Sequence, residues 1–214
     1  MSPPRIIGLT GLEGAGKDTV AAILERHHQV TTAAFADTLR REICAAWYPG
    51  LCMADLTCRA TKEQPNHWLA LQYCADHHFI LALAAAAITL PVSAPISPRQ
   101  IMRWWGTEYR RKLDPDYWIN QMRAALTWHA SQEQAPACIV ITDVRFKNEA
   151  DLVREQGGQI WRIHRPGNNV QSTHISTTTG QEFAPDQTVI NAGDLDDLER
   201  AVLQHWAHAP LYNH

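Results

Sequence analysis

The sequence predicts an α/β fold of three layers, in which a five-stranded parallel sheet carries helices on both faces. Three observations predict it. Short apolar runs alternate with segments whose apolar residues recur at helical spacing. A glycine-rich turn, residues 11–16, stands between the first apolar run and the first helical segment. A later run, residues 137–143, is apolar until it ends in a carboxylate, as is typical of a central parallel strand.

Five strands and six helical segments are expected along the chain. The strands are expected at residues 5–10, 31–35, 137–143, 159–164 and 188–191. The helices are expected at residues 17–28, 38–47, 67–90, 148–156 and 194–206, with one more that begins after Ser97. Ser97 suits the N-cap of that helix and Pro98 its first position. Residues 67–90 are predicted to form a largely buried helix, and residues 49–66 a loop.

Composition bounds the function classes. The chain has 214 residues, 45% of them hydrophobic, and a formal charge of -3. This suits one substantial core and gives no general basic field, so nucleic acid is not an expected partner. The apolar stretch at 79–92 is too short for a membrane span, and no export signal is visible. Five cysteines without a C-x-x-C pair suit free thiols, so we expect a cytoplasmic protein.

The glycine-rich turn has the form of a phosphate-binding loop. Residues 6–19 read IIGLTGLEGAGKDT, which contains the pattern G-x-x-x-x-G-K. Glycines let backbone N–H groups face an anion, and the N-terminus of the following helix adds further donors. Lys17 is then expected to bridge the β- and γ-phosphates of a nucleoside triphosphate.

The residue after this lysine is unusual. Phosphate-binding loops of this form end in Ser or Thr, whose hydroxyl reaches magnesium, whereas this chain has Asp18 there and Thr19 one position later. An aspartate favours a helix N-terminus but repels phosphate, so we expect Asp18 to act through magnesium or its hydration shell. The alternative is that Asp18 only caps the first turn.

A run of arginines follows Ser97. At about 100° per residue, Arg99, Arg103 and Arg110 share one face of a helix, provided that Gly106 does not break it. Arg111 lies to one side. Planar guanidinium groups suit phosphate oxygens, which predicts a clamp for an acceptor phosphate. The alternative is a solvated face, paired with the nearby acids Glu108, Asp114 and Asp116.

Positions later in the chain also suggest phosphate chemistry. Asp143 ends a buried strand, where open α/β sheets bind ligands, and is expected to hold hydrated magnesium. Arg145 would lie on the same rim and meet a phosphate, unless the two side chains only bridge each other. Arg165 opens a polar stretch, residues 165–186, of a length typical of lids, and is expected to reach the transferred phosphoryl group. His174 in this stretch is either catalytic or a loop anchor.

Six motifs occur in order between residues 6 and about 206: GLEGAGKDT, FADTLR, RQIMRWWGTEYRR, WI, ITDVRFKNEA and VINAGDLDDL. With them the chain resembles the deoxynucleoside monophosphate kinases of bacteriophages and prophages. DVRFKNEA is the most specific motif, and the ending GKDT is common in that family. Residues 49–96 match least.

The resemblance implies a P-loop NTPase fold of the nucleoside monophosphate kinase type, with one domain over residues 1–214. Within it, a helical acceptor-binding region would span about 38–130 and a lid about 165–186. ATP, Mg²⁺ and a deoxynucleoside monophosphate are the implied ligands, and a deoxynucleoside diphosphate is the implied product.

The residues expected to bind ATP are Leu12, Glu13, Gly14, Ala15, Gly16, Lys17, Asp18, Thr19, Asn191 and Gly193. Those expected around the acceptor are Asp37, Arg40, Arg103, Arg110, Arg111 and Arg145. Lys17, Arg145 and Arg165 are the expected catalytic residues, and Asp18 and Asp143 the expected metal ligands.

Two departures from the family pattern keep other functions open. The family's lid motif is His-x-Ser-Glu, whereas Thr177 stands at the place of the acid here, and the 67–90 segment has no matching motif. One alternative is a kinase similar to dephospho-coenzyme A kinase, whose hydroxyl acceptor needs a base such as Asp37 or Asp143. The other is a protein that binds nucleotide without transfer. The sequence leaves the preferred base and a homodimer open.

Overall fold

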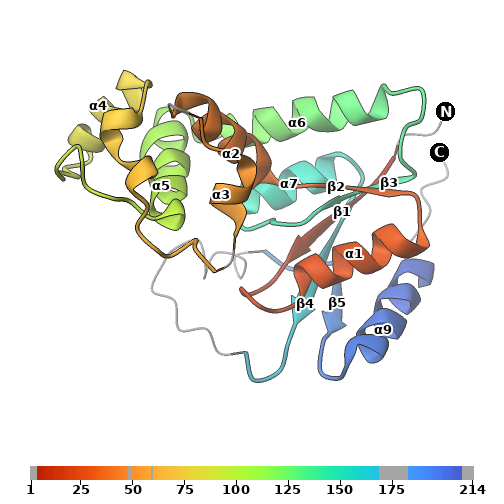
Figure 1. Ribbon diagram of the computed structural model, residues 1–214. Helices are drawn as coiled ribbons and strands as arrows, with labels where there is room; N and C mark the ends of the chain where they lie inside the picture. Colours follow the sequence, from red (N-terminus) through yellow and green to blue (C-terminus); the bar gives the residue numbers. More distant parts are fainter. Residues whose placement is uncertain (1–3, 48–49, 59, 169–182, 209–214) are drawn as a thin grey trace. The chain divides into compact units, whose positions relative to one another are not determined.

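A parallel sheet forms the centre of the chain. The computed structural model describes residues 4–47, 50–58, 60–168 and 183–208. The sheet has five strands in the order β2-β3-β1-β4-β5, all parallel, as the sequence predicts (Figure 1). The strands are β1 Arg5–Thr10, β2 Val30–Ala33, β3 Cys138–Ile141, β4 Gln159–His164 and β5 Gln187–Ile190.

The chain divides into two compact units, which we describe separately. The first unit combines residues 1–35 with residues 119–214 and contains the sheet. The second unit comprises residues 36–118 and is helical among its described residues. The expected lid is largely outside the described residues, so the expected single domain with a lid stays a prediction.

Helices cover both faces of the sheet in the first unit. On one face lie α1 Lys17–His27 and α9 Leu195–His208, and on the other lie α6 Tyr117–Ala130 and α7 Lys147–Glu155 (Figure 1). Alternate strand residues point to α1 and α9, because side chains of a strand alternate between faces. The resulting core includes Ile7, Leu9, Val140, Trp161, Ile23, Leu24 and Val202.

Glycine brings α7 close to the sheet on the opposite face. A Cβ atom added at Gly8 would lie 2.9 Å from a Val144 methyl and 3.1 Å from a Val153 methyl. A larger residue in the middle of β1 would therefore push away the turn and the helix that follow β3. The closeness of this contact fixes where the β3–α7 turn lies.

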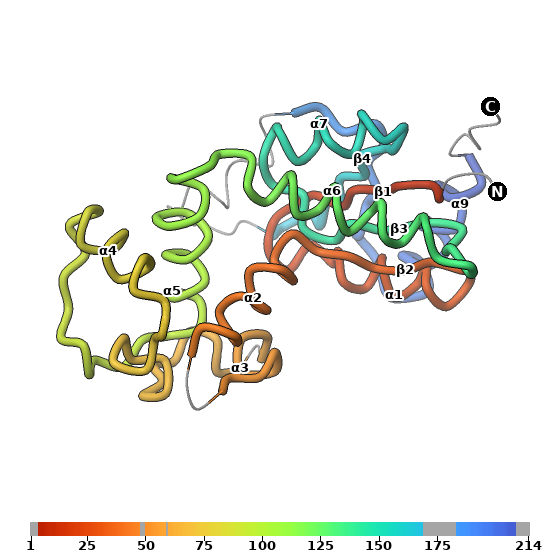
Figure 2. The backbone as a smooth tube through the Cα atoms, turned by 90° about the horizontal axis from the view of Figure 1, so that it is seen from above, coloured from red at the N-terminus to blue at the C-terminus, as the bar shows by residue number. Residues whose placement is uncertain are grey.

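The second unit is built from short helices (Figure 2). They are α2 Phe35–Ala46, α3 Met53–Thr57, the 3₁₀ turns His67–Leu69 and Leu71–Tyr73, α4 His77–Ala85, α5 Pro98–Arg103 and a π-helix, η3 Trp104–Arg111. The structure gives residues 49–66 a short helix where the sequence predicts only a loop.

The prediction of one largely buried helix at 67–90 is wrong. Two caps start separate turns: just before the segment the Asn66 side chain accepts a hydrogen bond from Trp68 N (2.9 Å), and within it Asp76 Oδ1 accepts one from Phe79 N (3.1 Å). The second cap starts a new helix, which ends before Ala87 at a positive φ of 56°. Leu81 of this helix is 65% exposed, so the segment is not largely buried.

The arginine-bearing helix starts as predicted but changes its winding. Ser97 Oγ caps it by accepting from Gln100 N (3.2 Å). Gly106 does not break it; instead residues 104–111 wind as a π-helix, whose hydrogen bonds join residues five apart. The α-helical spacing of 100° therefore does not hold beyond Arg103, and the predicted common face of Arg99, Arg103 and Arg110 is wrong.

In the part of the chain that the structure describes, no helix combines the length and the apolar character that a membrane crossing requires.

A pair of glycine variants tests how the loop after β1 is held. Gly11 and Gly14 both have a positive φ, but a Cβ at Gly11 would lie 2.3 Å from the backbone oxygen of Ile163, whereas one at Gly14 meets nothing closer than 3.7 Å. We expect Gly11→Ala to lower the free energy of unfolding by about 3 kcal/mol or more, and Gly14→Ala by about 1 kcal/mol. Urea unfolding measures both; equal losses would contradict this account of the loop.

Candidate functional site

The glycine-rich loop joins β1 to α1 and leaves the helix N-terminus open. Gly16 is the N-cap of α1 with φ 105°, and no side chain caps this helix. The loop is closed by a hydrogen bond from Ala15 N to Leu12 O (3.1 Å). The first N–H groups of a helix have no partner within the helix, and together with the helix dipole they favour an anion. The loop therefore has the form of a phosphate site.

Two asparagine side chains hold the loop from outside. Asn191 Nδ2 donates to Ala15 O and Asn168 Nδ2 donates to Glu13 O, both at 2.8 Å. Asn191 follows β5, and a Cβ at Gly16 would lie 2.6 Å from its Nδ2 atom. Asn191 was expected at the nucleotide, and the structure places it on the loop. Sequence reasoning missed Asn168; the only signal was an amide side chain after Pro166 and Gly167.

Lys17 is the charged centre of the loop. Its ammonium group donates to Gly11 O (2.7 Å) and Leu12 O (3.0 Å). Burial and the nearby Arg145 lower the pKa of Lys17, while the carboxylates of Asp18, Asp143 and Glu13 act to raise it. The residues expected at the triphosphate and the metal therefore lie within electrostatic reach of one lysine. Lys17 and Arg145 are both cations, and an anion between them is favoured.

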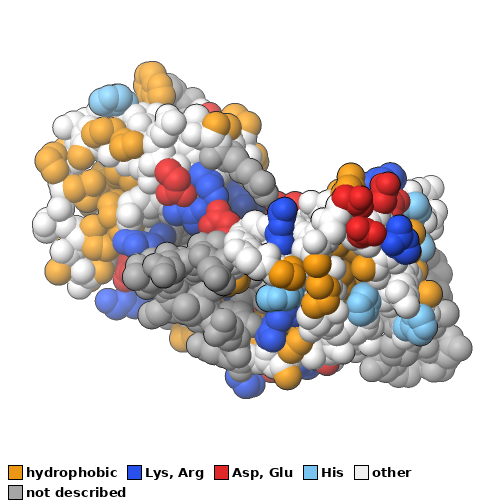
Figure 3. Space-filling model, turned by 90° about the horizontal axis from the view of Figure 1, so that it is seen from below, with side chains coloured by type: hydrophobic (Ala, Val, Ile, Leu, Met, Phe, Trp, Pro, Cys, Tyr) orange, Lys and Arg blue, Asp and Glu red, His pale blue; other side chains and the backbone are white. Residues whose placement is uncertain are grey.

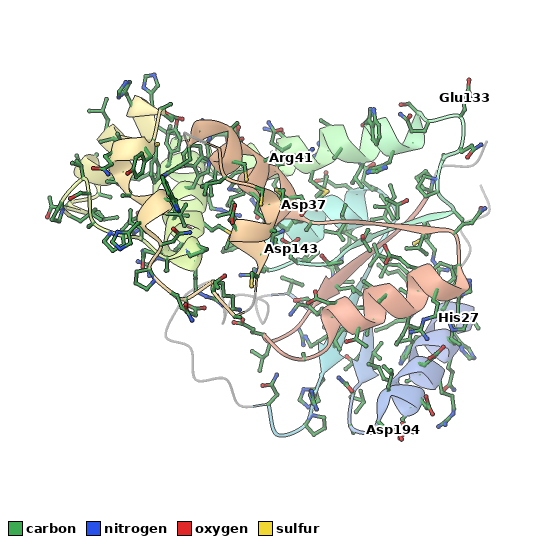
Figure 4. The ribbon with its side chains drawn as sticks, in the orientation of Figure 1. His27, Asp37, Arg41, Glu133, Asp143 and Asp194 are labelled. Carbon is green, nitrogen blue, oxygen red and sulfur yellow. The ribbon has the colours of Figure 1, made fainter. Side chains whose placement is uncertain are left out.

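Asp143 lies beyond the end of β3 and also begins a helix. Its Oδ1 accepts a hydrogen bond from Phe35 N (2.8 Å), the first residue of α2. Figure 4 labels Asp143 at this edge of the sheet. The carboxylate is thus oriented by a backbone donor, as well as lying near Lys17. Its position at the C-terminal end of a central strand agrees with the ligand edge of open α/β sheets.

Glu149 holds the turn that carries Arg145. It is only 2% exposed, and its Oε2 accepts hydrogen bonds from Arg145 N (2.7 Å) and Phe146 N (3.1 Å). These bonds satisfy backbone donors at the start of α7, as in a capping box. The Arg145 side chain itself is exposed. Sequence reasoning missed Glu149, because Phe146 has no side-chain acceptor and the usual capping-box signal, Ser or Thr three residues before Glu, is absent.

The acidic residues fit a magnesium ion that is held mainly through phosphate. The described residues contain no group of three or more His, Cys, Asp or Glu that could bind a metal by itself. Magnesium in kinases takes one or two carboxylates and completes its shell with phosphate oxygens and water. Asp18 and Asp143 supply two carboxylates near Lys17. Asp18 is exposed and Thr19 is half-buried, and Asp18 is the one of the two whose charge acts on Lys17.

Gly193 lies in a tight turn before α9. Asp197 N donates to Asp194 Oδ1 (2.9 Å), and a Cβ at Gly193 would come within 2.2 Å of Asp197 Oδ2. A larger residue at Gly193 would therefore displace the Asp197 side chain at the start of α9, near Asp194 in Figure 4. Its expected role in binding ATP stays a prediction.

Arg165 is exposed at the start of a turn that is closed by Asn168 N donating to its carbonyl oxygen (3.2 Å). Its catalytic role stays a prediction. His174 and Thr177, with most of the expected lid, lie outside the described residues.

In the second unit, Asp37 and Arg40 pair with each other. Arg40 Nη1 lies 3.0 Å from Asp37 Oδ1, one turn apart on α2. Arg41 points elsewhere and donates to Thr38 Oγ1 (3.0 Å); Figure 4 labels both Asp37 and Arg41 on this helix. Arg40 Nε is buried and has no hydrogen-bond partner among the described residues. A buried donor of this kind is a place where an anion would be favoured.

Arg110 is paired with a residue that the sequence did not suggest. Its Nε donates to Glu42 Oε2 (2.8 Å), and not to Glu108, Asp114 or Asp116. Of the other arginines expected at the acceptor, Arg103 is exposed and Arg111 is half-buried.

Comparisons with known proteins identify the family of the chain. A family model described as deoxynucleotide monophosphate kinase matches residues 72–202, which is more than half of the chain. A curated protein of Acanthamoeba polyphaga mimivirus, named provisionally as a deoxynucleotide monophosphate kinase, is 28% identical over 186 residues. The match covers 80% of this chain and 79% of the relative.

Similar solved structures include a dephospho-CoA kinase from Campylobacter jejuni, with 12% identity and a TM-score of 0.44 over 95% of this chain and 96% of that one. A sugar kinase from Janibacter sp. HTCC2649 has 15% identity and a TM-score of 0.42, with 97% of each chain covered. Likeness this low says nothing about function.

Truncation of Glu149 tests its hold on the turn. We expect Glu149→Ala to lower the free energy of unfolding by about 3 kcal/mol, because two N–H groups lose their buried acceptor. Glu149→Gln keeps an acceptor oxygen and should lose less. The matched control is Glu155→Ala on the same helix, whose ion pair with Arg123 is exposed and should cost about 0.5 kcal/mol or less. Urea unfolding that gave equal losses for Glu149→Ala and Glu155→Ala would contradict the assignment.

Proposed function

The chain belongs to the deoxynucleotide monophosphate kinase family, and from this premise we propose that it transfers the γ-phosphoryl group of ATP to the 5′-phosphate of a deoxynucleoside monophosphate. Membership makes it a phosphotransferase of the nucleotide kinase kind. ATP as donor, magnesium as metal and the diphosphate as product are our proposal.

One observation carries the proposal for the donor. Lys17 sits inside a glycine loop at an uncapped helix N-terminus, with Arg145 and two carboxylates within electrostatic reach. This combination suits a triphosphate with its metal, because backbone N–H groups and cations meet the phosphate oxygens while the carboxylates suit a divalent ion. A substrate with a single carboxylate or hydroxyl group would not engage both cations and both carboxylates at once.

The residues of the loop would act by position and charge. Lys17 and the amides of α1 would hold the β- and γ-phosphates, and Arg145 would offset negative charge that spreads over the transferred group. Magnesium, when bound by Asp18 and Asp143, would neutralise further charge on the phosphate oxygens. Asp143 keeps its orientation through the N–H of Phe35.

The acceptor needs no general base in this reaction. A nucleoside 5′-phosphate is already anionic at neutral pH, so the protein has only to bind and align it. We propose that the arginines of the second unit, Arg40, Arg103, Arg110 and Arg111, together with Asp37, bind this acceptor. Arg165 is proposed to meet the transferred group from the lid.

A single assay separates this function from its two rivals. ADP release would be followed with ATP and magnesium against deoxy- and ribonucleoside monophosphates and dephospho-coenzyme A, with product masses measured. We expect a deoxynucleoside diphosphate. Transfer only to dephospho-coenzyme A would indicate a hydroxyl acceptor, and ATP binding without transfer to any acceptor would indicate a binding protein; either result would overturn the proposal.

Replacement of the loop lysine tests the donor site. We expect Lys17→Ala to lower kcat/KM by about a thousandfold or more, because it removes the cation that meets the transferred phosphoryl group. The matched control is Lys147→Ala, which removes an exposed lysine paired with Asp151 and should leave kcat/KM within about twofold. Activity retained by Lys17→Ala would remove the loop from the mechanism.

A further inference from the structure

One carboxylate in the second unit collects three side-chain donors. Glu42, on α2, accepts hydrogen bonds at Oε2 from Trp105 Nε1 (2.7 Å) and Arg110 Nε (2.8 Å). The hydroxyl of Tyr117 donates to its other oxygen, Oε1. Hydrogen bonds to an ionised acceptor are stronger than neutral ones, so the three donors hold this carboxylate in one orientation.

The π-helix makes this arrangement possible. Trp105 and Arg110 are five residues apart, and in an α-helix they would differ by about 140° around the axis. In a π-helix, residues five apart lie one turn above each other, so both side chains can reach the same oxygen of Glu42. Unusual winding of this kind is frequent at functional sites. The departure from α-helical spacing thus has a definite result: it brings an indole and a guanidinium to one carboxylate.

Aromatic rings fix the plane of the Arg110 guanidinium. Its central carbon lies 4.4 Å from the ring centroid of Tyr109, 5.0 Å from that of Tyr117 and 5.5 Å from that of Trp105. Cations are attracted to the faces of such rings. Burial lowers the pKa of Arg110, but the hydrogen bond and charge of Glu42 outweigh it and raise the pKa overall, so the side chain stays charged.

The rings themselves are anchored. Tyr109 donates its hydroxyl to Asp76 Oδ2 (3.0 Å). Burial, followed by the hydrogen bond to Glu42, raises the pKa of Tyr117 to about 12, so Tyr117 remains a donor at any pH at which the protein would be assayed.

The contacts of Arg110 leave one edge for a ligand. Glu42 takes the Nε atom, and the two terminal nitrogens, Nη1 and Nη2, make no hydrogen bond to any described residue. The side chain is 24% exposed, so this end is reached by solvent. A guanidinium end with two parallel N–H groups matches two oxygens of a phosphate. Figure 3 shows basic and acidic side chains side by side on the surface of this unit.

We infer that Glu42 is a positioning residue of the acceptor site: it holds Arg110 by Nε so that the Nη1 and Nη2 end receives the 5′-phosphate of the nucleotide acceptor. This inference rests on the proposed function. Glu42 does not touch the acceptor; it acts through Arg110, with Trp105 and Tyr117 keeping the carboxylate in place.

A second glutamate–arginine contact of this unit lacks these features. Arg99 pairs with Glu63, and their side chains are 43% and 58% exposed. Glu42 is 18% exposed, so its pair with Arg110 is screened less by water. A surface ion pair needs neither an indole donor nor a tyrosine donor on the same carboxylate. Ordering these side chains costs conformational entropy. A requirement for one fixed orientation of Arg110 would explain why the protein bears this cost.

The test compares steady-state kinetics of Glu42→Gln with those of the wild type. We expect the KM for the deoxynucleoside monophosphate to rise about tenfold or more, because the guanidinium loses its charged anchor, while the KM for ATP stays within about twofold. The matched control is Glu155→Gln, which removes a glutamate from an exposed pair with Arg123 and should change neither KM. Equal rises in both KM values, or no rise, would overturn the inference.

A double-mutant cycle separates positioning from general stability. In an Arg110→Ala background, Glu42→Gln should no longer raise the acceptor KM, since its effect passes through Arg110. A full, additive rise in that background would overturn the inference. If Glu42→Gln does not fold, as judged by circular dichroism, Tyr117→Phe takes its place, with an expected rise of about threefold in the acceptor KM alone. An unchanged acceptor KM in folded Tyr117→Phe would then count against the inference.

Failure of the proposed function is a separate outcome. If the wild type transfers phosphate to no nucleoside monophosphate, the proposed function falls. The inference is then decided by titrating inorganic phosphate and following ³¹P line broadening. Weaker phosphate binding by Glu42→Gln than by the wild type and Glu155→Gln supports the anchored arginine as an anion site; equal binding by all three overturns it.

Discussion

Positive charges held close together are the constraint on which the rest of the structure depends. In the first unit burial lowers the pKa of Lys17, and the positive charge of the nearby Arg145 lowers it further. Such a site is unfavourable without negative partners, so carboxylates must lie near it. Their positions in turn require a sheet whose strands all end at one edge. The parallel order β2-β3-β1-β4-β5 supplies that edge, with the loop after β1 beside the turn after β3.

Carboxylates in this chain act on cations by two different routes. Asp18 and Asp143 act through charge, because they oppose the lowering of the pKa of Lys17 by burial and Arg145. Glu149 and Glu42 act through geometry: the first holds the backbone of Arg145, and the second holds the Nε atom of Arg110. The second route leaves the far end of each arginine for an anion, whereas a carboxylate on that end would compete with phosphate. An acid near an arginine is therefore not by itself a sign that the arginine is occupied.

The sequence predicted the sheet well because burial on both faces leaves a strong signal. The apolar run at 137–143 and the glycine loop could be read directly, and the structure has a strand and a loop there. The prediction for residues 67–90 failed because apolar content alone does not distinguish one helix from several. Asn66 and Asp76 are both good N-cap residues, and their side chains start separate turns.

The site was predictable where chemistry follows from a local motif, and not where it depends on contacts between distant segments. Lys17 and Asp143 lie in recognisable motifs. Glu42 does not: its partners are 63 to 75 residues away in the sequence, and the π-helix that brings two of them together violates the spacing used to predict the arginine face. Asn168 and Glu149 act on the backbone of other residues, which residue type alone does not reveal.

The aspartate in place of the usual hydroxyl follows from the same balance of charge. A phosphate loop with one lysine has one cation to satisfy, and a neutral Ser or Thr next to it is sufficient. Here burial lowers the pKa of Lys17, and Arg145, a second cation from the turn after β3, lowers it further. Asp18, the next residue after Lys17, acts in the opposite sense, and so does Asp143. The negative charge of Asp18 therefore offsets the positive charge of Arg145 at Lys17. An aspartate after the loop lysine and an arginine beyond the neighbouring strand are thus consistent with each other.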